Sequence, residues 1–420
     1  MKLVEQHIIK PTDKRYKDLC DILSKAKDLY NTAVFVIRQH YFNINNQKFT
    51  EDICSDSPYH YINYFEMNRR LKATNNKCYR ALPANTSQEV LKCVDRNWKS
   101  FFALLKAKQK GEYTENVNFP QYLKKQKYFH VVYNRMTLNQ DHSKTGIVRL
   151  PKTNIKFKIV HKNIQQIRFI PCTGFIAMEV VYEQPEKQPK SDNKRYASID
   201  LGVNNIAAVS SNVIKSFIIN GKPVKSINQY YNKAKARKQS ILPNGVYTSK
   251  AIQRLGLKRN SKIKDYLHKA SNYIVNQLVD NEINTLIIGK NNHWKQETNI
   301  RSINNQNFVC IPHSTFINML CYKCQLHGIN VILTEESYTS KASFFDNDDI
   351  PVYGDNIDNY KSSGKRIYRG LYKDSSGYCI NADINGALNI MRKYLNVASD
   401  WIIPLRSRGL VARPNRVSFC

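Results

Sequence analysis

The chain has 420 residues, 42% of them hydrophobic and 23% charged, a balance typical of a folded protein long enough for two or three domains. Its 65 Lys and Arg residues outnumber its 33 Asp and Glu residues, and the formal net charge of +32 predicts a polyanionic partner such as nucleic acid. The ten cysteines are scattered, and neither a signal-peptide core nor a run of ~18 apolar residues occurs, which argues against secreted and membrane proteins and predicts a cytoplasmic one.

Two helices are predicted in the first quarter of the chain. Apolar residues recur at helical spacing along residues 18–42, beginning at Leu19. A second helix should begin at the capping box Thr-Ser-Gln-Glu of residues 86–89 and carry one apolar face. We interpret Trp98 and Phe101 on that face as core residues rather than as platforms for nucleic-acid bases.

Short β-type runs separated by Gly, Pro and Lys follow the helices. They predict a small antiparallel barrel made from residues 1–14 and 115–190, into which a helical domain of residues 15–114 is inserted. The polar segment 184–195 is a credible linker to the next domain.

Strands alternate with amphipathic helices in the C-terminal half, which predicts an α/β domain with a mixed sheet. We assign residues 195–340 and 379–400 to this domain. Residues 341–378, polar and irregular, are predicted to be an insertion on its core. Residues 401–420 form a basic C-terminal tail.

Two acidic residues of this half have positions suited to binding metal ions. Hydrolysis of a phosphodiester by two metals needs acidic ligands that converge on ions ~3.5–4 Å apart. Asp200 interrupts an apolar strand, although it could also be a solvated residue at the strand end. Asp383 opens the last helix, where it could also be a plain helix cap.

These motifs resemble those of the TnpB family, the insertion-sequence-encoded relatives of type V CRISPR effectors. The run ASIDLGVNNIAAV resembles the family's first RuvC motif and DINGALNI its third. The segments HKASNYIV (268–275), YTSKAS (338–343), LYNTAVFVIRQ and LPANTSQEVLKCVDRNWKSFF are also similar to the family. The resemblance implies an α+β multidomain fold, with a helical recognition lobe inserted in a wedge-like β-barrel and followed by an RNase H-like α/β RuvC domain.

The same resemblance implies a function. It is that of an RNA-guided DNA endonuclease that depends on Mg²⁺ or Mn²⁺ and has guide RNA and target DNA as partners. Asp200 and Asp383 carry over as metal ligands. A nuclease-dead, repressor-like RNA-guided DNA binder is the alternative, and a guide-free DNA-binding protein auxiliary to transposition is a third hypothesis. The sequence leaves the oligomeric state open.

The chain departs from the family at the second RuvC motif, whose strand normally ends in Glu. Here Gly289 and Lys290 follow the apolar run, and the usual acid is missing. The next strand ends in Glu335 and Glu336, which should lie one strand away, about 4.8 Å across the sheet. We predict that one of the two replaces the missing ligand, without deciding which. The alternative is that both are solvated and the domain is inactive.

The chain also departs from the family's four-cysteine zinc ribbon. Ala342 stands where the first cysteine is expected, and Cys379 is alone. Cys321 and Cys324 form a C-x-x-C pair, but within a predicted helix and without a second pair. We therefore expect no zinc.

Overall fold

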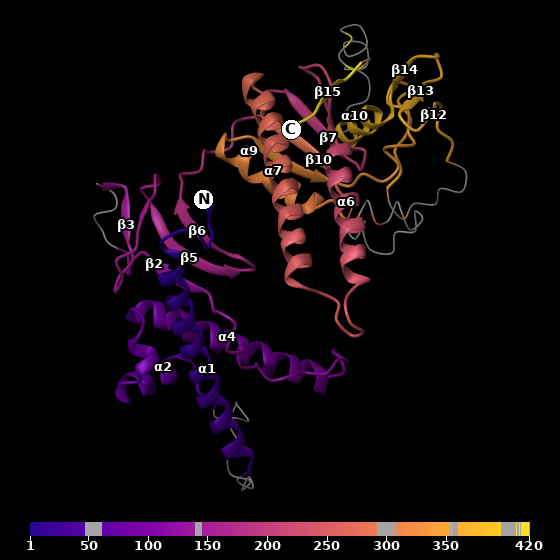
Figure 1. Cartoon of the computed structure of the whole chain (residues 1–420). Coiled ribbons are helices and arrows are strands. Elements are labelled where there is room, and N and C mark those ends of the chain that lie inside the picture. Colours follow the sequence, from indigo (N-terminus) through magenta and orange to yellow (C-terminus); the bar gives the residue numbers. More distant parts are fainter. Residues whose placement is uncertain are drawn as a thin grey trace. The chain divides into compact units, whose positions relative to one another are not determined.

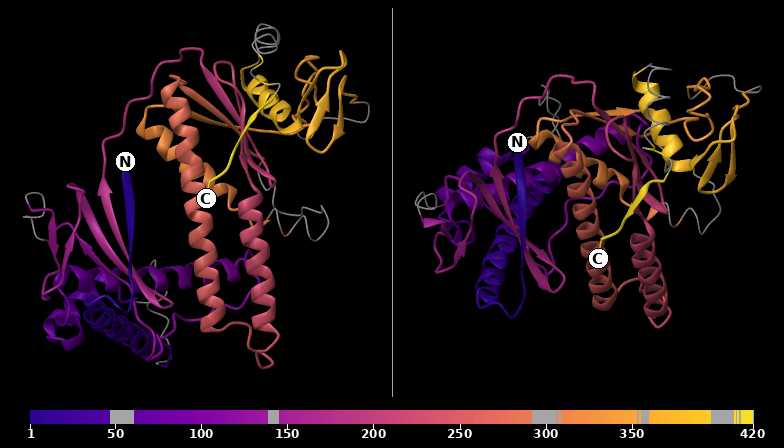
Figure 2. Two further views of the ribbon diagram at one scale, coloured as in Figure 1. Left: turned by 45° about the horizontal axis from the view of Figure 1, so that its top comes forward. Right: turned by 90° about the horizontal axis from the view of Figure 1, so that it is seen from above.

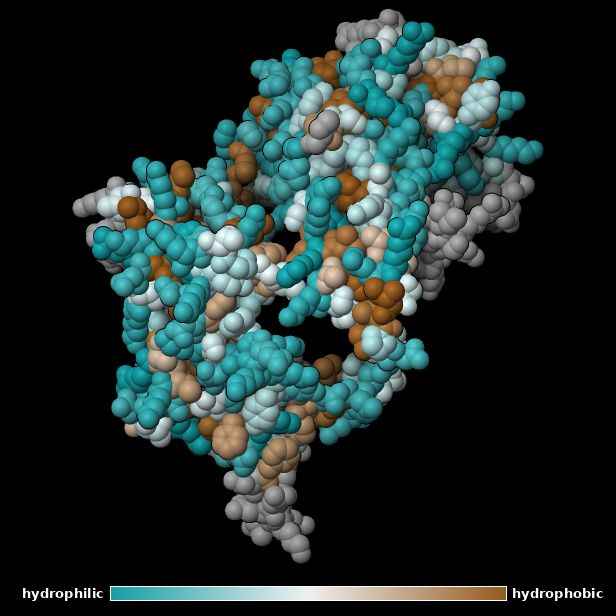
Figure 3. Space-filling view, viewed as in Figure 1, coloured by the Kyte–Doolittle hydropathy of each residue, from teal (hydrophilic) through white to brown (hydrophobic). Residues whose placement is uncertain are grey.

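The computed structural model of the chain describes residues 1–46, 61–138, 145–291, 306, 309–352, 354, 360–395, 409, 411 and 413–419. They form two compact units, Met1–Gln184 and Pro185–Cys420 (Figure 1). Hydrophilic side chains dominate the face shown in Figure 3, as the high net charge leads one to expect. Across the described ranges, no helix is both long and apolar enough to span a bilayer.

The first unit combines helices with an antiparallel sheet. Its elements are β1 (Lys2–Ile9), α1 (Tyr16–Asn46), α2 (Tyr64–Ala73), α3 (Lys77–Arg80), α4 (Ala84–Gln109), β2 (Val131–Asn134), β3 (Ile147–Arg149), β4 (Lys156–Lys158), β5 (Ile164–Cys172) and β6 (Phe175–Glu183). Hydrogen bonds join four strands in the order β1-β6-β5-β2, while β3 and β4 form a separate pair. Among the described residues β1 and β2 do not pair with each other, so the predicted closed barrel is not confirmed.

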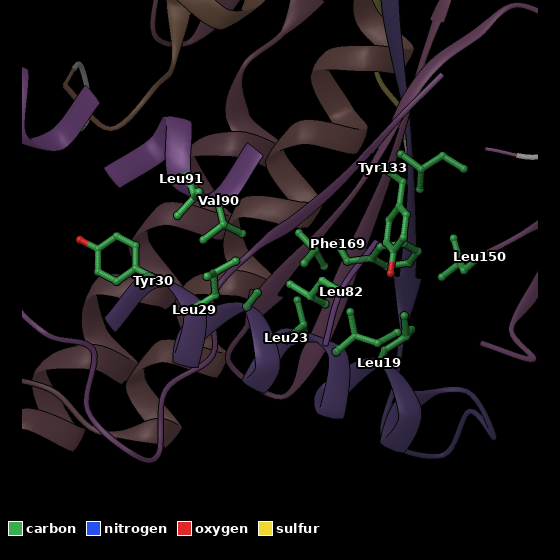
Figure 4. Close-up of a cluster of buried hydrophobic side chains, with 14 of the residues drawn as sticks. Leu19, Leu23, Leu29, Tyr30, Leu82, Val90, Leu91, Tyr133, Leu150 and Phe169 are labelled. Carbon is green, nitrogen blue, oxygen red and sulfur yellow. The ribbon is translucent and has the colours of Figure 1, made fainter. Parts of the chain in front are cut away.

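One hydrophobic core joins the helices of the first unit to its sheet (Figure 4). Leu19 of α1 and Leu91 of α4 belong to the same buried cluster as Phe169 of β5. Trp98 and Phe101 are 0% and 5% exposed, which confirms that they are core residues.

The predicted start of the second helix is wrong. Helix α4 begins at Ala84, directly after Pro83, whose φ of −57° is already suited to a helix. The hydroxyl of Ser87 donates to the backbone oxygen of Tyr79 at 2.8 Å, and the start of α4 has no side-chain cap.

The second unit is a mixed sheet with helices on both faces. Its elements are β7 (Tyr196–Leu201), β8 (Asn205–Ser211), β9 (Phe217–Asn220), α6 (Lys222–Gln239), α7 (Lys250–Asp280), β10 (Thr285–Gly289), α9 (His313–Leu326), β11 (Asn330–Thr334), β12 (Lys365–Tyr368), β13 (Leu371–Lys373), β14 (Cys379–Asn381), α10 (Ala382–Leu395) and β15 (Asn415–Val417). Six strands are ordered β11-β10-β7-β8-β9-β15. Strand β7 lies inside the sheet, parallel to β10 and antiparallel to β8.

Two apolar layers cover this sheet. On one face, Ala197 and Ile199 of β7 pack with buried side chains of α7 and α9. On the other, Tyr196 of β7 and Ile287 of β10 share a cluster with apolar residues of α10. Figures 1 and 2 show α10 across the sheet from α7 and α9. Strand β7 is therefore buried on both sides, which explains its nearly continuous apolar run.

The segment predicted to be an irregular insertion contains regular structure. Strands β12, β13 and β14 form an antiparallel sheet that continues past residue 378 and leads directly into α10. Asp348 accepts hydrogen bonds from the backbone N–H groups of Ser343 (2.7 Å) and Ser363 (3.0 Å). These contacts fix loops of the segment. Its strands are only four, three and three residues long, too short for a periodic apolar pattern, which is why the sequence pattern misses them. Most of the predicted tail, 401–420, lies outside the described residues, but its strand β15 pairs with β9.

Candidate active site

Asp200 lies near the end of β7, on the face of the sheet covered by α10. On the same face, two residues earlier, the Ser198 hydroxyl donates to the backbone oxygen of Ala387 at 2.6 Å. A Cβ built on Gly386 would lie 2.7 Å from Oδ2 of Asp200, so α10 approaches the carboxylate closely because residue 386 has no side chain. The Asp200 carboxylate therefore packs against α10.

Asp383 lies in the first turn of α10 without capping it. The side-chain oxygen of Asn381 accepts from the N–H groups of Asp383 (3.0 Å) and Ile384 (3.3 Å) and satisfies the helix start. The Asp383 carboxylate instead accepts a 2.6 Å hydrogen bond from the side-chain amide of Asn205, at the start of β8. The alternative of a plain helix cap is thus excluded, and the carboxylate is held toward the neighbouring strands.

Glu336 fills the space above Gly289. A Cβ built on Gly289 would lie 2.7 Å from Oε2 of Glu336 and 2.5 Å from Cδ1 of Ile390. The backbone N–H of Glu336 donates to the side-chain oxygen of Asn291 at 2.9 Å, which ties the exit of β11 to that of β10. The Glu336 carboxylate therefore occupies the position left open by the acid missing from β10.

Glu335 is directed elsewhere. Its carboxylate forms an ion pair with Lys393 of α10 and accepts from the backbone N–H of Ser337 at 2.6 Å. Burial tends to raise the pKa of Glu335, but the hydrogen bonds from Lys393 and Ser337 outweigh it and the pKa lies below its usual value. Of the two adjacent acids, Glu336 is the one whose charge acts on Asp200.

The charges of neighbouring acids act on the pKa values of Asp200 and Glu336. Burial, and then the charges of Glu336 and Asp383, hold the pKa of Asp200 well above its ordinary value. Burial, followed by the charge of Glu335, raises the pKa of Glu336 to about 7. The guanidinium of Arg366, on β12, acts in the opposite direction on Asp200. Buried carboxylates that lie close together raise one another's pKa values in this way unless a bound cation neutralises them.

The donor set fits a divalent cation chemically. Carboxylate oxygens are preferred ligands of Mg²⁺ and Mn²⁺. Oxygen Oε2 of Glu336 is buried and has no hydrogen-bond partner in the described part of the chain. In these same ranges, no three His, Cys, Asp or Glu side chains already have an arrangement that could hold a metal ion. The carboxylates would therefore have to draw closer around a bound cation.

The cysteines weighed as zinc ligands are dispersed. Cys321 and Cys324 lie on α9, where Cys324 is buried in the hydrophobic core. Cys379 is exposed on β14. Ala342 is fully buried.

Sequence reasoning missed several neighbours of the carboxylates. Asn205 and Lys393 orient Asp383 and Glu335, and neither has a local signal because each contact spans more than 50 residues. Arg366 belongs to a strand that the pattern did not predict. Gly386 did have a signal, because a glycine inside a helix costs about 1 kcal/mol and often marks a close approach.

Comparisons with known proteins agree with the motifs. A family model described as a probable transposase, OrfB_IS605, matches residues 179–295, and a Cas12f1-like TNB domain model matches residues 313–390. The TnpB-like protein ORF457 of Acidianus two-tailed virus is 22% identical over 427 residues, covering 92% of this chain and 84% of that protein.

Solved structures of other proteins are also similar to this chain. One is a Cas12f1–sgRNA–target DNA complex, with 14% identity, coverage of 92% of this chain and 98% of that chain, and a TM-score of 0.34. Another is the mini-RNA-guided endonuclease CRISPR-Cas_phi3, with 11% identity, coverage of 93% and 92%, and a TM-score of 0.48. The family models and the viral relative, joined to the sequence motifs, show that the chain is similar to TnpB-like proteins.

Proposed function

We propose that this chain is an RNA-guided DNA endonuclease whose divalent cations are held by Asp200, Asp383 and Glu336. The RNA-guided activity is the one that the TnpB resemblance implies, with guide RNA and target DNA as partners. The net charge of +32 supports polyanionic partners. The helical lobe, the wedge and the RuvC domain, with the boundaries predicted from the sequence, are part of this proposal, as is the cytoplasmic location.

The position of Glu336 carries the proposal. Gly289 ends the strand on which the family places its Glu, and the carboxylate of Glu336 enters the vacated space from the loop after the neighbouring strand. The parallel pairing of β10 with β11 sets Thr334 beside Gly289, so a residue two positions after Thr334 reaches back over the glycine. An inactive domain would have no need for a buried acid with an unpartnered oxygen at this place.

Each residue then has a distinct task. Asp200 is fixed on an interior strand, Asp383 on a helix start, and Glu336 on the loop after β11, so their backbones are set by three separate elements. Two Mg²⁺ or Mn²⁺ ions would supply an activated water and stabilise the charge that develops on the phosphate oxygens. Asn205 orients Asp383, while Lys393 keeps Glu335 away from Glu336 and so limits the negative charge that gathers there.

The competing function is a nuclease-dead RNA-guided DNA binder. Two observations favour it, namely the glycine in place of the usual acid and the lack of a ready three-residue metal arrangement in the described ranges. The two functions differ in one respect, which is whether Glu336 is needed for cleavage.

The test uses the chain purified from its native locus with its RNA, which is sequenced to define a matching target plasmid. Asp200→Ala, Asp383→Ala and Glu336→Gln should abolish cleavage in Mg²⁺ or Mn²⁺ and leave target binding nearly unchanged, because affinity rests on distributed phosphate contacts. Glu335→Gln is the matched control and should still cleave. If the wild-type complex binds its target but cuts in neither metal, the nuclease-dead function is the correct one.

A further inference from the structure

The hairpin of α6 and α7 has an unusual charge. From Lys222 to Lys264 the chain carries twelve Lys and Arg residues and no Asp or Glu. A charged helical surface normally mixes both signs, since ion pairs between neighbouring turns stabilise helices. A segment with only positive charge is repelled by itself and is stabilised by a polyanion.

Only part of this hairpin belongs to the hydrophobic core. The second half of α7, from Ile263 onward, packs under the sheet. In contrast, Ile252 is the one buried residue of the first half of α7, and α6 buries only Val224 and Asn228. Figures 1 and 2 show the two helices side by side, extending beyond the sheet toward their connecting turn.

A cavity lies between the two helices in this projecting part. Its volume is about 350 Å³, within the range of small-ligand sites. Tyr230 and Tyr231 of α6 line one side, and Leu255, Lys258 and Lys262 of α7, spaced by three and four residues, line the other. Tyr230 is 69% exposed, so one aromatic face is open to a ligand.

The wall of the cavity is fixed by Arg259. Its guanidinium donates to the side-chain oxygen of Asn228 at 2.7 Å and to the backbone oxygen of Cys310 at 2.8 Å, and it lies 5.7 Å from the centre of the Tyr231 ring. The charge of Arg259 is therefore used for contacts within the protein. Lys258 and Lys262 are exposed and form no ion pair within the described residues, so they are the charges left for a ligand.

We propose that this cavity holds an unpaired nucleotide of the guide RNA, with the base stacked on Tyr230 and the flanking phosphates at Lys258 and Lys262. Aromatic rings beside basic side chains bind unpaired nucleotides, because the base of a duplex is not free to stack on them. We assign the guide RNA as the occupant because a hairpin with only positive charge is stabilised by a polyanion that stays bound. Under the proposed function the guide RNA stays bound to the protein, whereas each target DNA is bound only for a time. This inference rests on the proposed function for the identity of the RNA.

The experiment uses the full chain freed of nucleic acid and a fluorescent, 20-nucleotide, single-stranded RNA of mixed sequence. Tyr230→Ala should weaken binding by roughly fivefold to 100-fold, the effect expected for loss of one stacked base. Tyr230→Phe keeps the ring and should bind like the wild type. Tyr247→Ala is the matched control, since Tyr247 is 79% exposed on the same hairpin but does not line the cavity.

A second measurement addresses the phosphates. The double variant Lys258→Gln with Lys262→Gln should reduce the salt dependence of RNA binding by about two in the log–log slope, or about one per lost phosphate contact. Ultraviolet crosslinks from the RNA should map to α6 and α7 in the wild type and disappear in Tyr230→Ala.

The inference is overturned if Tyr230→Ala and Tyr247→Ala bind the RNA equally well. It is also overturned if Tyr230→Ala weakens the binding of a DNA oligonucleotide of the same length but does not weaken the binding of the RNA. Guided cleavage is assayed in parallel, so that the two proposals fail separately. A wild-type chain that never cuts, yet binds RNA through Tyr230, retains this site and loses the proposed nuclease function.

Discussion

Replacing Glu336 by Gln should change how the stability of the second unit depends on pH. The pKa of Glu336 rises from 4.5 to about 7 on folding because the group is buried. Between these values the folded chain keeps a proton that the unfolded chain has released, so stability falls as the pH rises through this window. At roughly 1.36 kcal/mol per pH unit, the loss amounts to about 3 kcal/mol.

The glutamine variant cannot lose this proton, and it also removes one charge that raises the pKa of Asp200. In EDTA, we expect the wild type to lose Tm relative to Glu336→Gln between pH 5 and pH 8. For a unit of this size, about 3 kcal/mol corresponds to roughly 6–12 °C. Adding Mg²⁺ at pH 8 should restore the wild type more than the variant, because the cation replaces the proton as partner of the carboxylate.

The assay is thermal unfolding followed by circular dichroism, with RNA removed. Glu335→Gln is the matched control. The ion pair with Lys393 helps to keep the pKa of Glu335 below its usual value, so this variant should instead lose stability at neutral pH. Equal pH dependence of the wild type and Glu336→Gln would refute the reasoning and with it the buried position of this acid.

Three further predictions follow from the packing around α10. Gly289→Ala should destabilise the second unit by about 1–3 kcal/mol in thermal unfolding and reduce cleavage, because the new Cβ would overlap Ile390 and Glu336. Asn389→Ala should loosen the chain that follows Ala342, detected as faster limited proteolysis there, because the Asn389 amide donates to the backbone carbonyls of Thr339 and Ala342. Elemental analysis should find no tightly held zinc, and one zinc per chain would contradict the view that the ligand set is incomplete.

The sequence was most informative for features that depend on the residue pattern of a single helix or strand. The long helix of residues 18–42 and the apolar run around Asp200 follow from periodicity and burial, and both are present in the structure. The choice between Glu335 and Glu336 could not be predicted, because both residues follow the last paired residue of β11 and strand alternation no longer fixes their directions. The deciding contact is the ion pair with Lys393, which lies 58 residues further along the chain.

Asp383 shows a different limit of sequence reasoning. An Asp at the start of a helix is a good cap, and nothing in the local pattern assigns that task to Asn381 instead. Only the structure shows that the Asn381 side chain accepts from the N–H groups of Asp383 and Ile384, which leaves the Asp383 carboxylate available to face Asn205. The insertion is a further case, because its strands are only four, three and three residues long and show no apolar alternation that the sequence could reveal.

The order of the elements along the chain has a consequence for synthesis. Strand β1 pairs along its length with β6, so the first unit is complete once residue 184 has left the ribosome. The three facing acids arrive far apart, with β7, after β11 and at the start of α10, and the last of them is Asp383. Because N-terminal units fold first during translation, a nascent or interrupted chain ending before α10 has a finished first unit and no carboxylate cluster. Under the proposed function, incomplete products of translation would therefore be unable to cut DNA.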